Sequence, residues 1–77
     1  MWNIERITSD PKVMNGKACI RGMRITVSIV LNLLANGMTK AEILEDYPYL
    51  ESEDIDQCLN YAAYLAEEAL YVTQKVS

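Results

Sequence analysis

The sequence predicts a mainly α-helical fold, a three-helix domain of helix-turn-helix-like order with a short N-terminal β-hairpin or extended region. Near residue 26 the chain changes from short extended segments to helical periodicity. Capping and terminating residues divide the helical part into three segments. A length of 77 residues suffices for one domain. We therefore expect a single domain over 1–77, with an extended or hairpin arm over 1–26 and a three-helix core over 27–72.

The arm combines turn signals with short extended segments. The loose alternation of residues 2–7 predicts an edge strand, and the cluster at 8–11 predicts a turn. The Asn-Gly pair at 15–16 is a strong hairpin signal, and residues 18–20 predict a brief strand. Gly22 is expected in a tight turn with positive φ.

Two helices are expected to follow the arm. Thr26 is a suitable N-cap for a helix over 27–36, whose amphipathic stripe is followed by Gly37 as a left-handed terminator. Thr39 and Glu42 have the spacing of a capping box and open a short helix over 39–46. Pro48 then prevents the helix from continuing.

A third, longer helix is expected over 52–72. Its apolar residues form one continuous stripe, made of Ile55, Cys58, Leu59, Ala62, Leu65, Ala66, Ala69 and Leu70. Tyr64 and Tyr71 lie nearly opposite that stripe, and Tyr61 lies on its flank. Two interpretations stay open, because these aromatics fit either a partner interface or ordinary surface tyrosines.

Charge is distributed unevenly along the chain. The net charge is −4, but residues 1–40 hold six of the seven basic residues and residues 41–77 hold nine of the eleven acidic ones. This asymmetry predicts two oppositely charged surfaces, or a basic arm that folds against acidic helices and neutralises them. Lys17, Arg21 and Arg24 accordingly are either parts of a structural hairpin or basic groups displayed toward an anionic partner.

The composition argues against an enzyme and against a resident metal or cofactor. The chain has no histidine, no phosphate-binding loop and no cysteine beside an evident base. Cys19 and Cys58 are far apart in sequence, and we expect two buried, reduced thiols. The sequence begins without a signal-peptide pattern and has no apolar run long enough for a membrane span, so a cytoplasmic location without membrane contact is expected.

One combination of residues resembles a known family. Its first part is Ile7, Asp10, Pro11, Gly16, Lys17, Ile20, Arg21, Gly22, Arg24, Ile25 and Val27, and its second part is Leu34, Gly37, Thr39, Ile43, Leu44, Tyr47, Pro48, Leu50, Ile55, Leu59, Tyr61 and Ala62. Over about residues 7–66 the chain resembles the family catalogued as domain of unknown function 433, whose members are predicted VapB-like antitoxins. It departs from the family pattern at Ala18, a common proline position, and at Met23, a common threonine position.

The resemblance implies a homodimeric antitoxin that binds and inhibits a PIN-like ribonuclease toxin from an adjacent gene, and that binds its own operator DNA. Arg21 or Arg24 could then pair with the acidic cluster of such a nuclease. The tyrosines at 61, 64 and 71 could supply apolar anchors.

The alternative function is a DNA-binding regulator that acts as a homodimer. The acidic start of the third helix, over 51–56, opposes DNA binding there because phosphates repel it. Any bound DNA would therefore contact the basic arm, with Lys12, Lys17, Arg21 and Arg24.

Overall fold

A computed structural model describes residues 3–76, and the side chains of residues 3–67. The elements in chain order are β1 (Ile7–Thr8), a 3-10 turn (Met14–Gly16), β2 (Cys19–Ile20), α1 (Val27–Ala35), α2 (Lys40–Asp46) and α3 (Ser52–Val76). The prediction of a mainly α fold with three helices and a short N-terminal hairpin is confirmed.

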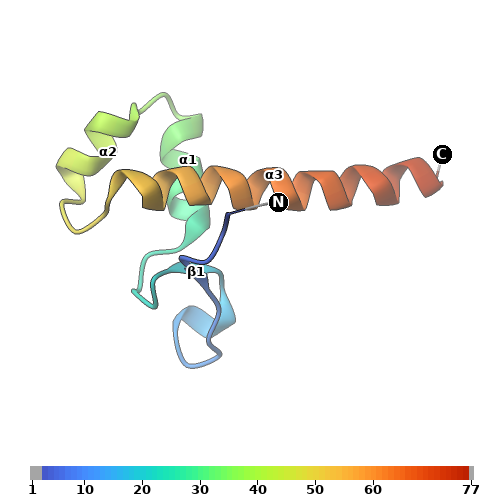
Figure 1. Cartoon of the computed structure of the whole chain (residues 1–77), viewed down its shortest axis with the longest axis horizontal. Coiled ribbons are helices and arrows are strands. Elements are labelled where there is room, and N and C mark those ends of the chain that lie inside the picture. The colour runs from blue at the N-terminus through green and yellow to red at the C-terminus, as the bar shows by residue number, and fades with distance from the viewer. Residues whose placement is uncertain (1–2, 77) are drawn as a thin grey trace.

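Figure 1 shows two parts of unequal thickness. The hairpin, α1, α2 and the first part of α3 lie together, and we call residues 3–62 the body. The rest of α3, residues 63–76, continues straight beyond the body, and we call it the overhang. The predicted third helix ended at residue 72, whereas α3 ends at Val76.

The hairpin differs from its prediction in register. β1 pairs antiparallel with β2, with Ile7 opposite Ile20 and Thr8 opposite Cys19. The predicted strand over 2–7 is wrong for most of its described length, because the Ile7 N–H donates to the Ile4 carbonyl in a turn at 3.0 Å. Thr8 consequently lies in the strand and not in the predicted 8–11 turn.

Turns with positive φ precede and follow β2. Asn15 and Gly16 have φ of 58° and 82° and lie in the 3-10 turn within the long connection from β1 to β2. Gly22 has φ of 72°, as expected, and Arg21 before it also has a positive φ of 49°. Two successive positive values at the centre of a turn are typical of a type I′ turn, and here the turn joins β2 to the segment that bridges it at Thr26.

The helix caps predicted from the sequence are confirmed. Thr26 Oγ1 accepts the N–H of Ile29 at 3.2 Å, and Gly37 ends the α1 region with φ of 96°. Thr39 and Glu42 form the reciprocal capping box, with bonds of 2.8 and 3.1 Å. These local signals set the helix starts within one residue of expectation.

The core lies where the hairpin meets the three helices. Its buried apolar residues are Cys19, Ile20, Ile25, Val27, Val30, Ile43, Leu50, Ile55 and Cys58. Both thiols are free and buried, as predicted. Burial, together with the nearby negative charge of Asp54, raises the pKa of Cys58 to about 12.

The apolar stripe predicted along α3 is buried only in its first part. Ile55 and Cys58 are fully buried, but Leu59 and Leu65 are each 47% exposed. Ala69 and Leu70 lie outside the described side chains. The apolar stripe is continuous along the sequence, but the body covers only part of it, because α3 continues beyond the body (Figure 1).

Candidate partner-binding surface

A cluster of charged side chains joins the arm to the start of α3. Arg21 binds Asp54 through two bonds, from Nε to Oδ1 at 3.0 Å and from Nη2 to Oδ2 at 2.8 Å. Arg6 Nη1 donates to the same Oδ1 at 3.0 Å and to Glu51 Oε1 at 2.6 Å. We call these four residues the arginine–aspartate cluster. It neutralises arm cations with helix carboxylates, which confirms that open alternative for Arg6 and Arg21.

Asp54 is the centre of this cluster, and its side chain is completely buried. The Glu51 N–H also donates to Asp54 Oδ2 at 2.7 Å, which satisfies a backbone donor at the start of α3. Burial alone raises the pKa of Asp54, but the hydrogen bonds from Arg21, Glu51 N–H and Arg6 outweigh it and lower the pKa to about 2. The carboxylate is therefore held ionised.

Gln57 extends the contact by one turn of α3. Its side chain is 1% exposed, and its Oε1 accepts the Arg6 N–H at 2.7 Å. Its Nε2 donates to Glu53 Oε2 at 3.2 Å. The sequence pattern indicated no role for Arg6 or Gln57, and it grouped Asp54 with the acidic start of the third helix. The available signal was the spacing of Asp54 and Cys58, which puts a carboxylate on the buried face of the helix.

The three basic residues singled out in the arm occupy different surroundings. Arg21 is held by Asp54 and also donates to the Tyr49 carbonyl at 3.0 Å. Arg24 is exposed, and among the described residues its side chain has no ion pair or hydrogen bond. It lines a hollow of about 230 Å³ with Met23, Ile25 and Tyr49. Lys17 lies elsewhere, at an apolar groove.

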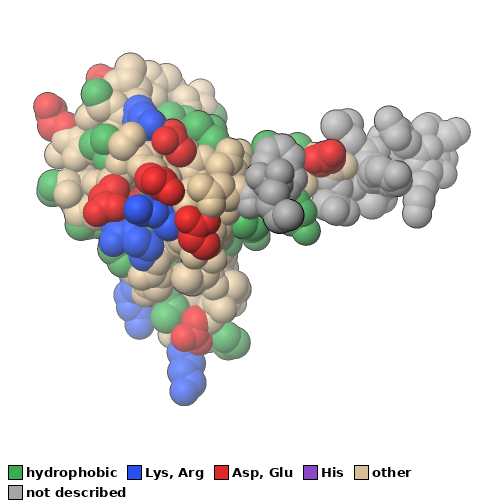
Figure 2. All heavy atoms as spheres, in the orientation of Figure 1, with side chains coloured by type: hydrophobic (Ala, Val, Ile, Leu, Met, Phe, Trp, Pro, Cys, Tyr) green, Lys and Arg blue, Asp and Glu red, His purple; other side chains and the backbone are tan. Residues whose placement is uncertain are grey.

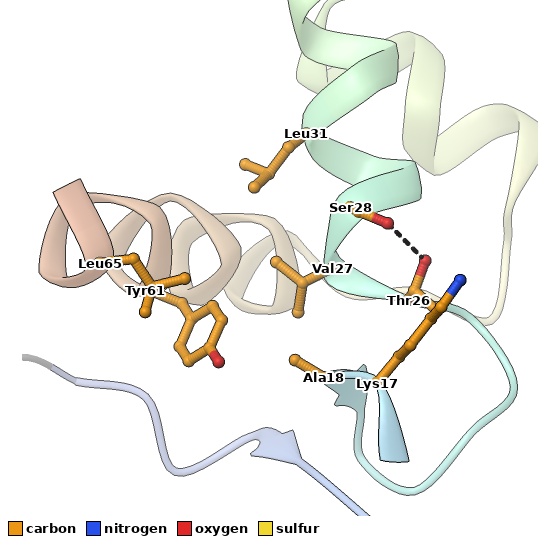
Figure 3. A pocket seen from close by; sticks show the side chains of 8 residues that line it. All are labelled: Lys17, Ala18, Thr26, Val27, Ser28, Leu31, Tyr61 and Leu65. Carbon is orange, nitrogen blue, oxygen red and sulfur yellow. Dashed lines mark hydrogen bonds between the residues drawn. The ribbon is translucent and has the colours of Figure 1, made fainter. Parts of the chain in front are cut away.

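That groove lies between β2, α1 and α3 and has a volume of about 370 Å³. Its lining residues are Lys17, Ala18, Thr26, Val27, Ser28, Leu31, Tyr61 and Leu65, shown in Figure 3. Thr26 and Ser28 share a hydrogen bond at 3.1 Å along one wall. Tyr61 and Leu65 form the wall contributed by α3, so the groove reaches the point where the overhang begins.

The three tyrosines predicted on α3 are not equivalent. Tyr61 is half-buried and packs against the core as well as lining the groove. Tyr64 is 37% exposed, on the overhang. Tyr71 lies outside the described side chains. Partner binding by these residues stays a prediction.

Charge on the visible face of the body is mixed. Figure 2 shows blue Lys and Arg side chains among red Asp and Glu side chains there, while green apolar side chains lie where the helix leaves the body.

Within residues 3–67, no three His, Cys, Asp or Glu side chains gather where they could hold a metal ion. No helix in the described part of the chain has the length and apolar character to cross a membrane.

Comparison with known proteins gives one match. The family described as "Protein of unknown function (DUF433)" matches residues 7–62. The match covers the hairpin, α1, α2 and the part of α3 that packs in the body, and it ends where the overhang begins. No curated protein and no solved structure gives a significant match.

Proposed function

The chain belongs to the DUF433 family, and from this premise we propose that it is an antitoxin-like protein that binds and inhibits a PIN-like ribonuclease toxin from an adjacent gene. Nucleases of this type hold divalent metal ions with clustered carboxylates. A guanidinium can pair with such carboxylates through two parallel hydrogen bonds, displacing metal or substrate.

The observation that supports the proposal is the contrast between the two arginines of the hairpin turn. The Arg21 guanidinium donates hydrogen bonds to the Asp54 carboxylate and to the Tyr49 carbonyl within the chain. Arg24, three residues later, is exposed and keeps its donors available among the described residues. Arg24 is therefore the group that reaches the nuclease, and Arg21 holds the turn that carries it.

The turn that carries Arg24 is fixed from several sides. The Met23 N–H donates to the Ile20 carbonyl at 2.9 Å, and the Gly22 N–H donates to Thr8 Oγ1 at 2.8 Å. A turn that is already ordered loses little conformational entropy on binding, which favours tight association.

Co-expression with the tagged product of the adjacent gene tests this function. The wild-type chain should co-purify and suppress RNA cleavage, and Arg24→Glu should weaken binding at least tenfold, since charge reversal puts like charges together. Lys12→Glu is the matched control, because it makes the same charge change at another exposed residue of the arm. Failure of the wild-type chain to bind, or full inhibition by Arg24→Glu, would exclude the proposal.

Operator binding by a homodimer is the second candidate function. Exposed Lys12, Lys17 and Arg24 favour it, since cations contact phosphates. The exposed carboxylates of Glu51, Glu53 and Asp56 oppose it at the start of α3, where a helix-turn-helix protein would read bases. Retention of DNA from upstream of its own gene that falls steeply with salt would support this function, and no retention at low salt would exclude it.

A further inference from the structure

The hairpin turn after β2 and the loop from α2 to α3 lie side by side in the body (Figure 1). Arg21 joins the two segments, because its Nη2 donates to the Tyr49 carbonyl at 3.0 Å and also to the Asp54 carboxylate at 2.8 Å. The bond to Tyr49 connects residues 28 positions apart in the sequence. The hollow of about 230 Å³ is built from these two segments, and it is lined by Met23, Arg24, Ile25 and Tyr49.

The hollow combines an apolar base with an exposed aromatic ring and a cation. Ile25 is buried in the core, and Met23 is half-buried and packs against it. Tyr49 is 53% exposed, and its ring meets the half-buried ring of Tyr47 edge to face, with centroids 6.2 Å apart. Arg24 is the charged residue of the lining, and it is exposed. Tyr and Arg are enriched among the residues that contribute most to binding at protein interfaces.

The charge balance around the hollow favours an anionic partner group. The arginine–aspartate cluster contains two guanidinium groups and two carboxylates, which neutralise one another. Arg24 forms no ion pair with any side chain that the structure describes. Its charge is therefore left uncompensated, and a carboxylate can pair with it through two hydrogen bonds.

The volume of the hollow indicates the kind of ligand that it fits. Sites for small molecules and cofactors typically have volumes of about 300–1,000 Å³. A hollow of about 230 Å³ is smaller, and it suits a side chain that a protein partner projects. A partner segment with a carboxylate next to an apolar side chain would match both the guanidinium and the apolar base.

We propose that Arg24 and Tyr49 form one composite site for two neighbouring side chains of the toxin, a carboxylate on Arg24 and an apolar group against Tyr49 and Met23. This inference rests on the proposed antitoxin function, and it adds Tyr49 as a residue that contacts the toxin. Because Arg21 already holds the turn to the loop, the two contacts require little ordering on binding.

A double-mutant cycle tests the site, with affinities for the purified product of the adjacent gene measured by titration calorimetry. Arg24→Gln and Tyr49→Ala should each weaken binding at least about fivefold. The double variant should lose about threefold less than the product of the two effects, because both side chains contact neighbouring groups of one partner. Tyr49→Ala keeps the backbone carbonyl that accepts from Arg21, so its helix content should equal that of the wild-type chain.

Two further variants make the test specific. Tyr49→Phe keeps the ring and should bind as the wild-type chain does, because the ring supplies the apolar contact. Ile29→Ala is the matched control, since Ile29 is 38% exposed on α1 and lines neither the hollow nor the groove. Unchanged binding by Tyr49→Ala, or two effects that simply multiply, would overturn this inference and leave the antitoxin function in place. A wild-type chain that does not bind the product of the adjacent gene would overturn both.

Discussion

The two parts of α3 differ in which side chains they bury. In the body, the helix buries Asp54 and Gln57, which are 0% and 1% exposed. On the overhang, it exposes Tyr64 and Leu65 at 37% and 47%. Two polar side chains are thus buried beside Ile55 and Cys58, while two large apolar or aromatic ones are exposed farther along the same helix.

The difference shows that the location of a partner group, and not polarity alone, sets burial along this helix. Asp54 and Gln57 can be buried because Arg6, Arg21 and backbone N–H groups satisfy them, and no buried side-chain polar atom among the described residues lacks a partner. Leu65 is exposed because the described chain places nothing over it. The buried polar groups of the body are satisfied within the chain, while Tyr64 and Leu65 of the overhang are not covered by it.

Of the substitutions considered, removal of the Asp54 carboxylate should have the largest effect on the contrast between the two parts of α3. Asp54→Ala leaves two guanidinium groups without their shared acceptor and frees the Glu51 N–H, which should lower the free energy of unfolding by about 3 kcal/mol. Urea unfolding at fixed protein concentration measures the change. Asp56→Ala is the control, since its ion pair with Lys40 is exposed and should contribute less than about 1 kcal/mol. Equal effects of the two substitutions would contradict the central role of Asp54.

Acid should weaken the body in a defined pH range. The pKa of Asp54 is about 2 in the folded chain, below its ordinary value of 3.8. Because the folded pKa is the lower one, the stability contributed by this group is fully present above about pH 4 and is lost as pH falls toward 2, by about 2 kcal/mol. Unfolding free energies measured across this range should show the loss. Asp54→Asn should flatten the slope, and an unchanged slope in that variant would assign the acid sensitivity to other carboxyls.

Replacing the buried amide should have a smaller effect. Gln57→Leu keeps the side-chain volume but leaves the Arg6 N–H without its acceptor, which should cost about 1 to 2 kcal/mol. Thermal and urea unfolding measure it. Asn60→Leu, one turn later, removes an exposed bond to the Asn3 carbonyl and should change stability by less than about 0.5 kcal/mol. If Gln57→Leu instead stabilised the chain, the body would tolerate an apolar helix face, and the contrast between the two parts of α3 would lose its physical basis.

Local signals predicted the helices, and long-range contacts decided the rest. Thr26, Gly37 and the Thr39–Glu42 box act within a few residues, so the helix boundaries could be read from the sequence. The Arg21–Asp54 contact joins residues 33 positions apart, and no local pattern specifies it.

The absence of a local pattern for long-range contacts also explains the errors in the arm and in α3. A charged residue is ordinarily assigned to the surface, so Asp54 was placed with its exposed neighbours rather than in the core. The edge strand was placed too early because alternation in a short segment does not reveal that Ile7 N–H bonds back to Ile4. Which arginine of the basic arm stays available depends on the fold, because Arg21 is bound to Asp54.

The two buried thiols allow the opening of two parts of the body to be measured separately. Cys19 lies in the hairpin and Cys58 in α3, and neither is accessible in the closed chain, at 2% and 0% exposure. A thiol-specific reagent can modify each of them only during an opening that exposes it, so the two modification rates report the opening of two separate parts of the body. Equal rates mean that the hairpin and helices open as one unit, whereas faster modification of Cys19 means that the hairpin, and Arg24 with it, detaches before the helices separate.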